Sequence, residues 1–280
     1  MSWVQIPLAA PNSSLSPTLA RIAKAAPQQS PATAAPAPGN LFAGTSGWAY
    51  ATWKPGFYPA TVPAKSFLSY YGSRLNSVEV NYTFRALPTP AMLANWIAAV
   101  PPNFRFSFKA PQRITHIRRL RDCAADLEQF LAALSPAQAA RKLGLLLFQL
   151  PPNFKAASGR LAAFLQSLPA QTPPTAFEFR HESWFTEEIY AILRAHNAAL
   201  CITESDDLRT PEVHTAPQHT AFRLRRDGGY SPAEIRKFAQ RFTTLAKDRT
   251  VYAYFKHEDE PTGALNAAAL LTKAIAEAIR

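Results

Sequence analysis

Short apolar runs recur along this chain, and most of them precede a segment with the apolar spacing of a helix. The runs are LFAGTS (41–46), SVEVN (77–81), FRFSFK (104–109), LGLLLFQ (143–149), AFEFR (176–180), ALCIT (199–203), AFRLR (221–225) and VYAYF (251–255). Helical patterns follow at, for example, 90–100 and 187–196. Strands that alternate with helices indicate a parallel sheet. The eight runs therefore predict either a (β/α)₈ TIM-type barrel, usually about 250 residues long, or a doubly wound open sheet.

The polar residues inside these runs decide between the two architectures. In SVEVN, FRFSFK, FEFR and AFRLR, apolar and polar residues alternate. Strands of an open parallel sheet are covered on both faces and are apolar on both. In a barrel, one face meets the outer helices and the other faces the lumen. We therefore predict a single α/β domain, a TIM-type barrel over residues 41–280. The residues expected to face its lumen are Glu79, Lys109, Glu178, Arg180 and Arg223.

Residues 1–40 differ from the rest of the chain. They contain seven prolines and ten alanines, a composition that cannot build a core. The pattern is compatible with a short helix over 15–26, and otherwise predicts a disordered, flexible tail. The first residues lack a basic segment followed by an apolar one, so we expect no secretory signal.

The net charge and the cysteine content limit which classes of partner and which cellular location we expect. The formal net charge of +11 favours anionic partners such as phosphorylated metabolites or nucleic acid, and is equally compatible with solubility alone. Apolar runs long enough to span a membrane are missing from the sequence, so we expect no membrane association. Cys123 and Cys201 are far apart in sequence and are expected to be reduced thiols in the cytoplasm.

Five motifs resemble one known family in content, order and spacing. They are GTSGWAYATWKPGFYP (44–59), LNSVEVNYTF (75–84), FKAPQRITH (108–116), LFQLPP (147–152) and FEFRHESWF (177–185). They are similar to the YecE-like family, also called domain of unknown function 72. The resemblance implies a TIM-barrel fold, and it names no reaction because the activity of the family is not established. The chain departs from the family pattern at Arg225-Arg226 and at Lys256-His257, which puts the family's site in doubt here.

The carboxyl ends of the strands carry the candidate catalytic residues, because TIM barrels form their sites there. Glu79 and Glu178 come from two different strands, and paired carboxylates across a cleft can divide general acid and base roles. Lys109 follows three alternating phenylalanines, and a desolvated lysine could act as a nucleophile. The competing interpretation is a lumen ion-pair network, in which Glu178 pairs with Arg180 or Arg223 and Glu79 pairs with Lys109.

Further residues at the same end are candidates for holding a substrate. Arginine binds carboxylate or phosphate with two hydrogen bonds, and tryptophan beside a cation suits stacking on a base or sugar ring. The predicted binding residues are Arg180, Arg223, Asn81, Gln149, His181, Trp48 and Trp184. We expect Trp53, Phe57 and Tyr58 to cap the barrel instead. Neither His181 nor His116 belongs to a metal-binding motif, and the nearby cations would repel a metal, so we predict neither metal nor cofactor.

Together these observations predict an enzyme of hydrolase or isomerase type that performs metal-independent acid–base chemistry. Its substrate would be a small anionic metabolite, sugar-like or nucleotide-like. The alternative is a nucleic-acid-binding module that uses the basic surface, and its affinity would fall steeply with salt. The sequence leaves the substrate and the oligomeric state open.

Overall fold

The computed structural model describes residues 39–205, 208–256 and 259–279. The eight strands are β1 (Leu41–Thr45), β2 (Ser77–Val80), β3 (Arg105–Lys109), β4 (Leu143–Gln149), β5 (Thr175–Glu178), β6 (Ala199–Glu204), β7 (His219–Leu224) and β8 (Thr250–Phe255). They form one parallel sheet in the order β1-β8-β7-β6-β5-β4-β3-β2. The first and last strands of this order also lie side by side, so the sheet curls into a nearly closed barrel. The predicted TIM-type barrel is confirmed.

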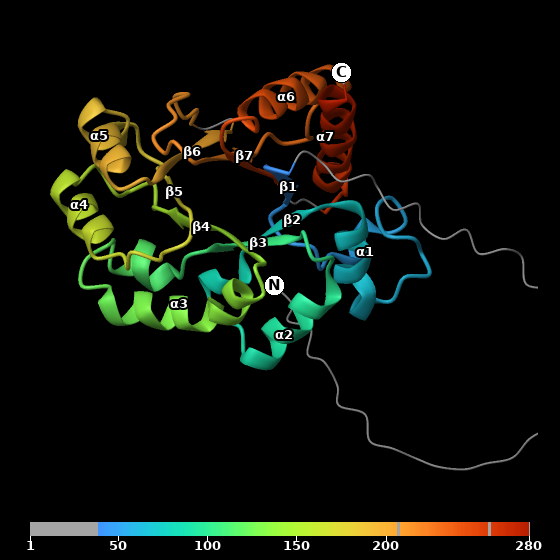
Figure 1. The fold of residues 1–280 in the computed structure, drawn as a ribbon, viewed down its shortest axis with the longest axis horizontal. Coiled ribbons are helices and arrows are strands. Elements are labelled where there is room, and N and C mark those ends of the chain that lie inside the picture. Colours follow the sequence, from blue (N-terminus) through green and yellow to red (C-terminus); the bar gives the residue numbers. More distant parts are fainter. Residues whose placement is uncertain (1–38, 206–207, 257–258, 280) are drawn as a thin grey trace, which may run out of the picture. The chain divides into compact units, whose positions relative to one another are not determined.

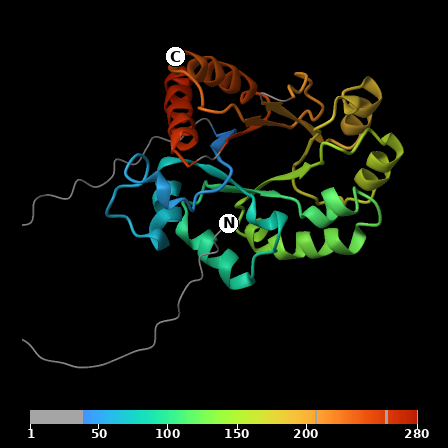
Figure 2. The ribbon, with the colours of Figure 1, turned by 180° about the vertical axis from the view of Figure 1, so that it is seen from behind.

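Helices connect most of the strands and lie outside them (Figures 1 and 2). The α-helices are α1 (Phe67–Arg74), α2 (Pro90–Ala99), α3 (Ala124–Ala139), α4 (Ser158–Gln166), α5 (Glu187–Ala195), α6 (Pro232–Leu245) and α7 (Thr262–Ala278). Short turns of other helix types are η1 (Ala51–Trp53), η2 (Ala64–Ser66), η3 (Tyr82–Phe84), η4 (Arg113–Ile117) and η5 (Glu182–Trp184). Residues 208–218, between β6 and β7, form no helix.

The N-terminal predictions concern residues that lie outside this description. Both the flexible tail over 1–40 and the helix over 15–26 fall largely or wholly on them, so the boundary at residue 40 stays a prediction. Within the described part of the chain, no helix is long and apolar enough to cross a membrane. Cys123 and Cys201 are buried, and neither forms a disulfide.

The alternation of rings and polar groups places the rings outside, as predicted. Phe148 of β4 packs on Phe164 of α4 with their ring centroids 5.3 Å apart, and Phe222 of β7 packs on Phe242 of α6 at 4.5 Å. The opposite strand faces fill the lumen with polar side chains and with a second apolar cluster that includes Leu145 and Leu147. In its middle, the Tyr254 hydroxyl hydrogen-bonds to Ser107 Oγ at 2.6 Å. The middle of the lumen is therefore packed, and its hydroxyl groups are paired there.

Side chains close the barrel between β1 and β2, where the described residues form no backbone ladder. Asn76 Oδ1 accepts a hydrogen bond from the Ala43 amide at 2.9 Å, and its Nδ2 donates to the Leu41 carbonyl at 2.8 Å. The Tyr71 hydroxyl accepts from the Thr45 amide at 2.8 Å and donates to the Ser77 carbonyl at 3.0 Å. A Cβ on Gly44 would lie 1.8 Å from the Ser77 carbonyl oxygen, so only glycine fits this close approach.

Candidate functional site

An ion-pair network fills the carboxyl end of the lumen. Arg223 of β7 donates to Glu79 of β2 through Nε to Oε2 at 2.9 Å and through Nη2 to Oε1 at 2.7 Å. Its third nitrogen, Nη1, donates to Oε2 of Glu178 in β5. All three side chains are 1–2% exposed. One guanidinium thus joins two carboxylates from strands that are not neighbours in the sheet.

Two further predicted residues complete the shell around Glu178. Gln149, at the end of β4, donates from Nε2 to both carboxylate oxygens of Glu178 at 3.0 Å. Arg180 lies just beyond β5, with its Nε 3.7 Å from Oε1 of Glu178 and its side chain 40% exposed. Glu178 therefore pairs with both arginines that were predicted as alternatives. Glu79 pairs with Arg223, whereas the sequence suggested Lys109 as its partner.

The electrostatics of the network keep both carboxylates ionised. Burial alone would raise the pKa of Glu79 and of Glu178, but the charges of Arg223 and the neighbouring arginines, together with hydrogen bonds to the carboxylates, outweigh it, so each pKa is lowered. Burial opposes the charge of Arg223 as well, yet the two carboxylates raise its pKa above the ordinary value. A general acid and base pair needs two carboxyls with pKa values pushed apart. Here both shift in the same direction.

Lys109, the third predicted catalytic residue, stands beside this network at the end of β3. The Thr83 hydroxyl donates to its carbonyl at 2.7 Å, which ties the strand end to η3. Its Nζ lies 4.1 Å from the centroid of the Phe84 ring. Burial and then the positive charge of Arg223 lower the pKa of Lys109 to about 8. This amine therefore changes charge close to neutral pH.

Arg225 belongs to the site as well, although it was not among the residues predicted to bind a substrate. It follows β7 two residues after Arg223, and the same alternation places both side chains toward the lumen. Its Nη1 donates to Ser46 Oγ at 2.5 Å. Burial and the charge of Arg223 lower its pKa to about 10. In the part of the chain that the structure describes, no carboxylate forms an ion pair with Arg225.

The other cations in the two segments that depart from the family pattern, Arg226 and Lys256, form ion pairs with surrounding carboxylates. Arg226 forms ion pairs with Glu204 at the end of β6 and with Glu234 of α6, both at 2.5 Å. Lys256 forms an ion pair with Asp227. Since carboxylates already neutralise Arg226 and Lys256, these two residues add less positive charge than Arg225 does to the mouth of the barrel, which is the end where the strands have their carboxyl ends.

The remaining predicted binding residues differ in how well they are placed. Asn81 directly follows β2, and its Oδ1 is buried with no hydrogen-bond partner among the described residues. His181 lies at the start of η5, where its Nδ1 accepts from the Ser183 amide at 3.1 Å. Trp48 is partly buried and packs edge-on against Trp96 at 5.2 Å. These three remain candidates for contact with a ligand.

Trp184 is placed as a packing residue. It is 0% exposed, its ring stacks on Phe179 with centroids 4.5 Å apart, and its indole N–H donates to the Phe154 carbonyl at 2.6 Å. A ring enclosed in this way offers no face to a substrate, so the predicted binding role does not fit its position. Trp53 and Tyr58, predicted to cap the barrel, are also 0% exposed and stack on one another.

The carboxyl end of the barrel holds more cations than carboxylates. Burial, followed by the charges of Lys109 and Arg180, lowers the pKa of His116, which places these cations near one another. Within the described ranges, no group of three or more His, Cys, Asp or Glu side chains could hold a metal ion. After Arg223 is paired with the two carboxylates, the mouth therefore keeps an excess of positive charge.

Comparison with solved structures supports the fold. A crystal structure of a DUF72 family protein from Thermotoga maritima is 26% identical, with a TM-score of 0.73, and the match covers 85% of this chain and 99% of that one. A second DUF72 family protein, from Enterococcus faecalis, is 19% identical with a TM-score of 0.66, covering 84% and 97% of the two chains. The second likeness shows the fold alone.

Sequence comparisons agree with the resemblance found in the motifs. The chain is 36% identical to UPF0759 protein YecE of Escherichia coli K12 over 121 residues, which is 43% of each protein. It is 29% identical to UPF0759 protein YunF of Bacillus subtilis over 156 residues, 54% of each. The matches thus span about half the length of these relatives. A family model described as "Protein of unknown function DUF72" matches residues 42–279, so the chain belongs to the DUF72 family.

Proposed function

We propose that this protein is an enzyme that binds a small anionic metabolite at the carboxyl end of its barrel and performs acid–base chemistry on it. One observation carries the proposal: the two buried carboxylates are paired with Arg223, which leaves Arg225 and Lys109 without an ion-pair partner among the described residues. Uncompensated charge at a partly buried site is costly unless a ligand of opposite charge binds there. A carboxylate or phosphate group meets that requirement.

The residues divide into three roles under this proposal. Arg225 and Arg180 hold the anionic group, because a guanidinium binds carboxylate or phosphate with two parallel hydrogen bonds. Lys109 transfers the proton, since its pKa of about 8 lies near neutral pH. Glu79 and Glu178 hold Arg223 in place, and Gln149 holds Glu178. This network keeps the carboxyl end of the lumen rigid, and its charges set the electrostatic potential at the Lys109 amine.

The remaining candidates favour a polar, ring-bearing substrate. Asn81 presents a buried amide oxygen without a partner within the described residues, which suits a hydroxyl donor on the ligand. Trp48 is only partly buried, which suits stacking on a sugar or base. We therefore propose a hydrolase or isomerase acting on a sugar-like or nucleotide-like anion. The free thiols Cys123 and Cys201 support the proposed cytoplasmic location.

The test is an anion screen by thermal shift on three proteins: wild type, Arg225→Met and Arg236→Met. Sugar phosphates, nucleoside monophosphates and sugar acids form the panel. Arg236 is exposed on α6, so its variant removes one positive charge from the outer surface of the barrel. We expect a subset of the panel to raise the melting temperature of wild type and of Arg236→Met and to leave Arg225→Met unshifted. Equal shifts in all three proteins would contradict the proposal.

A further inference from the structure

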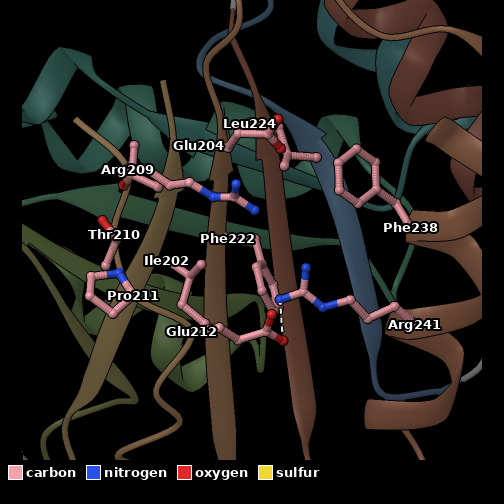
Figure 3. Close-up of a pocket in the computed structure, with 11 residues that line it drawn as sticks. Ile202, Glu204, Arg209, Thr210, Pro211, Glu212, Phe222, Leu224, Phe238 and Arg241 are labelled. Carbon is pink, nitrogen blue, oxygen red and sulfur yellow. Dashed lines mark ion pairs between the residues drawn. The ribbon is translucent and has the colours of Figure 1, made fainter. Parts of the chain in front are cut away.

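The barrel has a gap in its outer layer between β6 and β7. Residues 208–218 form no helix, so this irregular segment and α6 lie over the outer faces of β6 and β7 around Ile202 and Phe222. A pocket of about 350 Å³ lies there, bounded by β6, β7, the segment 209–212 and α6 (Figure 3). Pockets that hold small molecules in proteins span about 300–1,000 Å³. The gap is therefore large enough for a compact ligand.

The floor of the pocket is apolar. Ile202 of β6 and Phe222 and Leu224 of β7 point outward, because they alternate with the lumen-facing side chains Thr203 and Arg223. Phe238 of α6 forms the neighbouring wall and is partly buried. In the other sectors of the barrel, a helix packs on such outward rings. Here a ligand with an apolar body could take that place.

Two arginines reach into the pocket from opposite sides, as Figure 3 shows. Arg241 of α6 lies over the Phe222 ring at 4.7 Å and forms an ion pair with Glu212 at 2.6 Å, so its charge is matched. The other acidic residue of the lining, Glu204, is paired with Arg226. Arg209 is paired with no carboxylate of the described chain. As far as the described residues go, the lining thus carries one positive charge that no carboxylate neutralises.

Thr210 supplies an independent observation. It is 4% exposed and lines the pocket, yet its Oγ1 has no hydrogen-bond partner in the part of the chain that is described. Its amide donates to the Thr203 carbonyl at 3.1 Å, which fixes the residue against β6. A buried hydroxyl without a partner is uncommon, and a bound ligand is one way to satisfy it.

We propose that this pocket is a second binding site, separate from the mouth of the barrel, for a small monoanion with an apolar body, such as an aryl or branched-alkyl carboxylate. The apolar body lies on Ile202, Phe222 and Phe238. The carboxylate binds Arg209 and accepts a hydrogen bond from the Thr210 hydroxyl. The charge of the ligand matches the unpaired arginine, and its body replaces the missing helix. The inference stands on the outer strand faces and does not depend on the proposed activity.

Calorimetric titration with phenylacetate tests the proposal on wild type, Arg209→Met, Thr210→Val and Arg236→Met. Arg209 forms no hydrogen bond or ion pair with the described residues, and valine keeps the shape of Thr210, so both variants are expected to fold. We expect saturable binding to wild type and Arg236→Met. Because hydrogen bonds to charged groups contribute about 1.5–3 kcal/mol, binding to Arg209→Met should weaken by about tenfold or more.

The neutral isostere phenylacetamide and the inorganic anion sulfate complete the design. Phenylacetamide should bind wild type about tenfold or more weakly than phenylacetate, since it lacks the charge that meets Arg209. Thr210→Val should also lose affinity while its melting temperature stays level or rises, because a buried hydroxyl without a partner is removed. Unchanged phenylacetate binding in Arg209→Met would overturn the proposal. So would sulfate that displaces phenylacetate at equal concentration, because the apolar floor would then add nothing.

Discussion

At the scale of single residues, the guanidinium of Arg223 forms ion pairs with two buried carboxylates at once. Glu79, Glu178 and Arg223 are all 1–2% exposed, so none of them can exchange its partner for water. A buried ion pair adds little net stability over apolar packing, but removing one partner leaves an uncompensated charge. The network therefore constrains substitution strongly.

Replacing Arg223 by methionine is expected to destabilise the protein strongly. The change leaves two buried carboxylates facing one another, and breaking a buried pair costs about 3–5 kcal/mol. The free energy of unfolding in urea measures the loss, with Arg236→Met as the control for removal of one surface charge. A loss below about 1 kcal/mol, the range of exposed pairs, would mean that water reaches the network.

Stability should also fall in acid through the same network. The pKa of Glu79 and of Glu178 is lower in the folded protein than the ordinary value of 4.5. The network's contribution is therefore fully present above pH 4.5 and is lost as the pH falls through the folded-state pKa. We expect the melting temperature to drop below that pH, with a shallower drop in Glu178→Gln because one titrating group is gone. If the melting temperatures of wild type and Glu178→Gln fell in parallel with pH, Glu178 would not be one of the groups responsible for the loss of stability in acid.

Lys109 should give anion binding at the mouth a dependence on pH. Its pKa of about 8 means that the amine carries its charge below that pH and loses it above. Sulfate keeps a constant charge in this range, so its affinity should fall as the pH rises through 8. The affinity of Lys109→Met for sulfate should be lower and independent of pH over the same range. Titration at several pH values measures both, and a slope retained in the variant would assign the effect to another group.

At the scale of elements, the contact between β1 and β2 depends on side chains, where backbone hydrogen bonds join the other neighbouring strands. Asn76 satisfies one amide and one carbonyl of β1, and Tyr71 bridges the same two strands farther along. Gly44 allows the close approach that these bonds need. The barrel is closed here by two residues, so it should be most easily opened at this place.

Asn76→Ala should therefore open the barrel locally. It leaves the Ala43 amide and the Leu41 carbonyl without partners, and each unsatisfied buried group costs about 1–3 kcal/mol. We expect a loss of about 2–4 kcal/mol in the free energy of unfolding and faster hydrogen exchange at the Ala43 amide. Asn153→Ala is the control, because Asn153 forms an exposed contact with Arg119. Normal exchange at Ala43 in Asn76→Ala would show that the backbone closes the barrel without it.

At the scale of the whole molecule, the net charge of +11 leaves nucleic-acid binding as the alternative function. Association through the surface charge as a whole should fall steeply with salt and depend little on any one residue. We expect Arg225→Met to lose sulfate binding while its retention on immobilised RNA matches that of Arg236→Met at every salt concentration. If Arg225→Met alone lost RNA binding, the mouth would be a nucleic-acid site and the metabolite proposal would be wrong.

The sequence determined the architecture because the signals for it are local. Alternation within a strand sets which side chains face the lumen, so Glu79, Glu178 and Arg223 could be placed there from spacing alone. The same alternation places Arg225, two residues after Arg223, toward the lumen. The helical patterns follow from similarly short stretches of chain.

Only the tertiary structure decided which charges meet. Arg223 and Glu79 are 144 residues apart and lie on strands that are not neighbours, so their pairing depends on how the barrel closes. The same holds for Trp184, which alternation could not show to be enclosed by Phe154 and Phe179. Electrostatic and packing partners depend on distances across the lumen and between loops. These distances are set by strand tilt and closure, and no local pattern in the sequence encodes them.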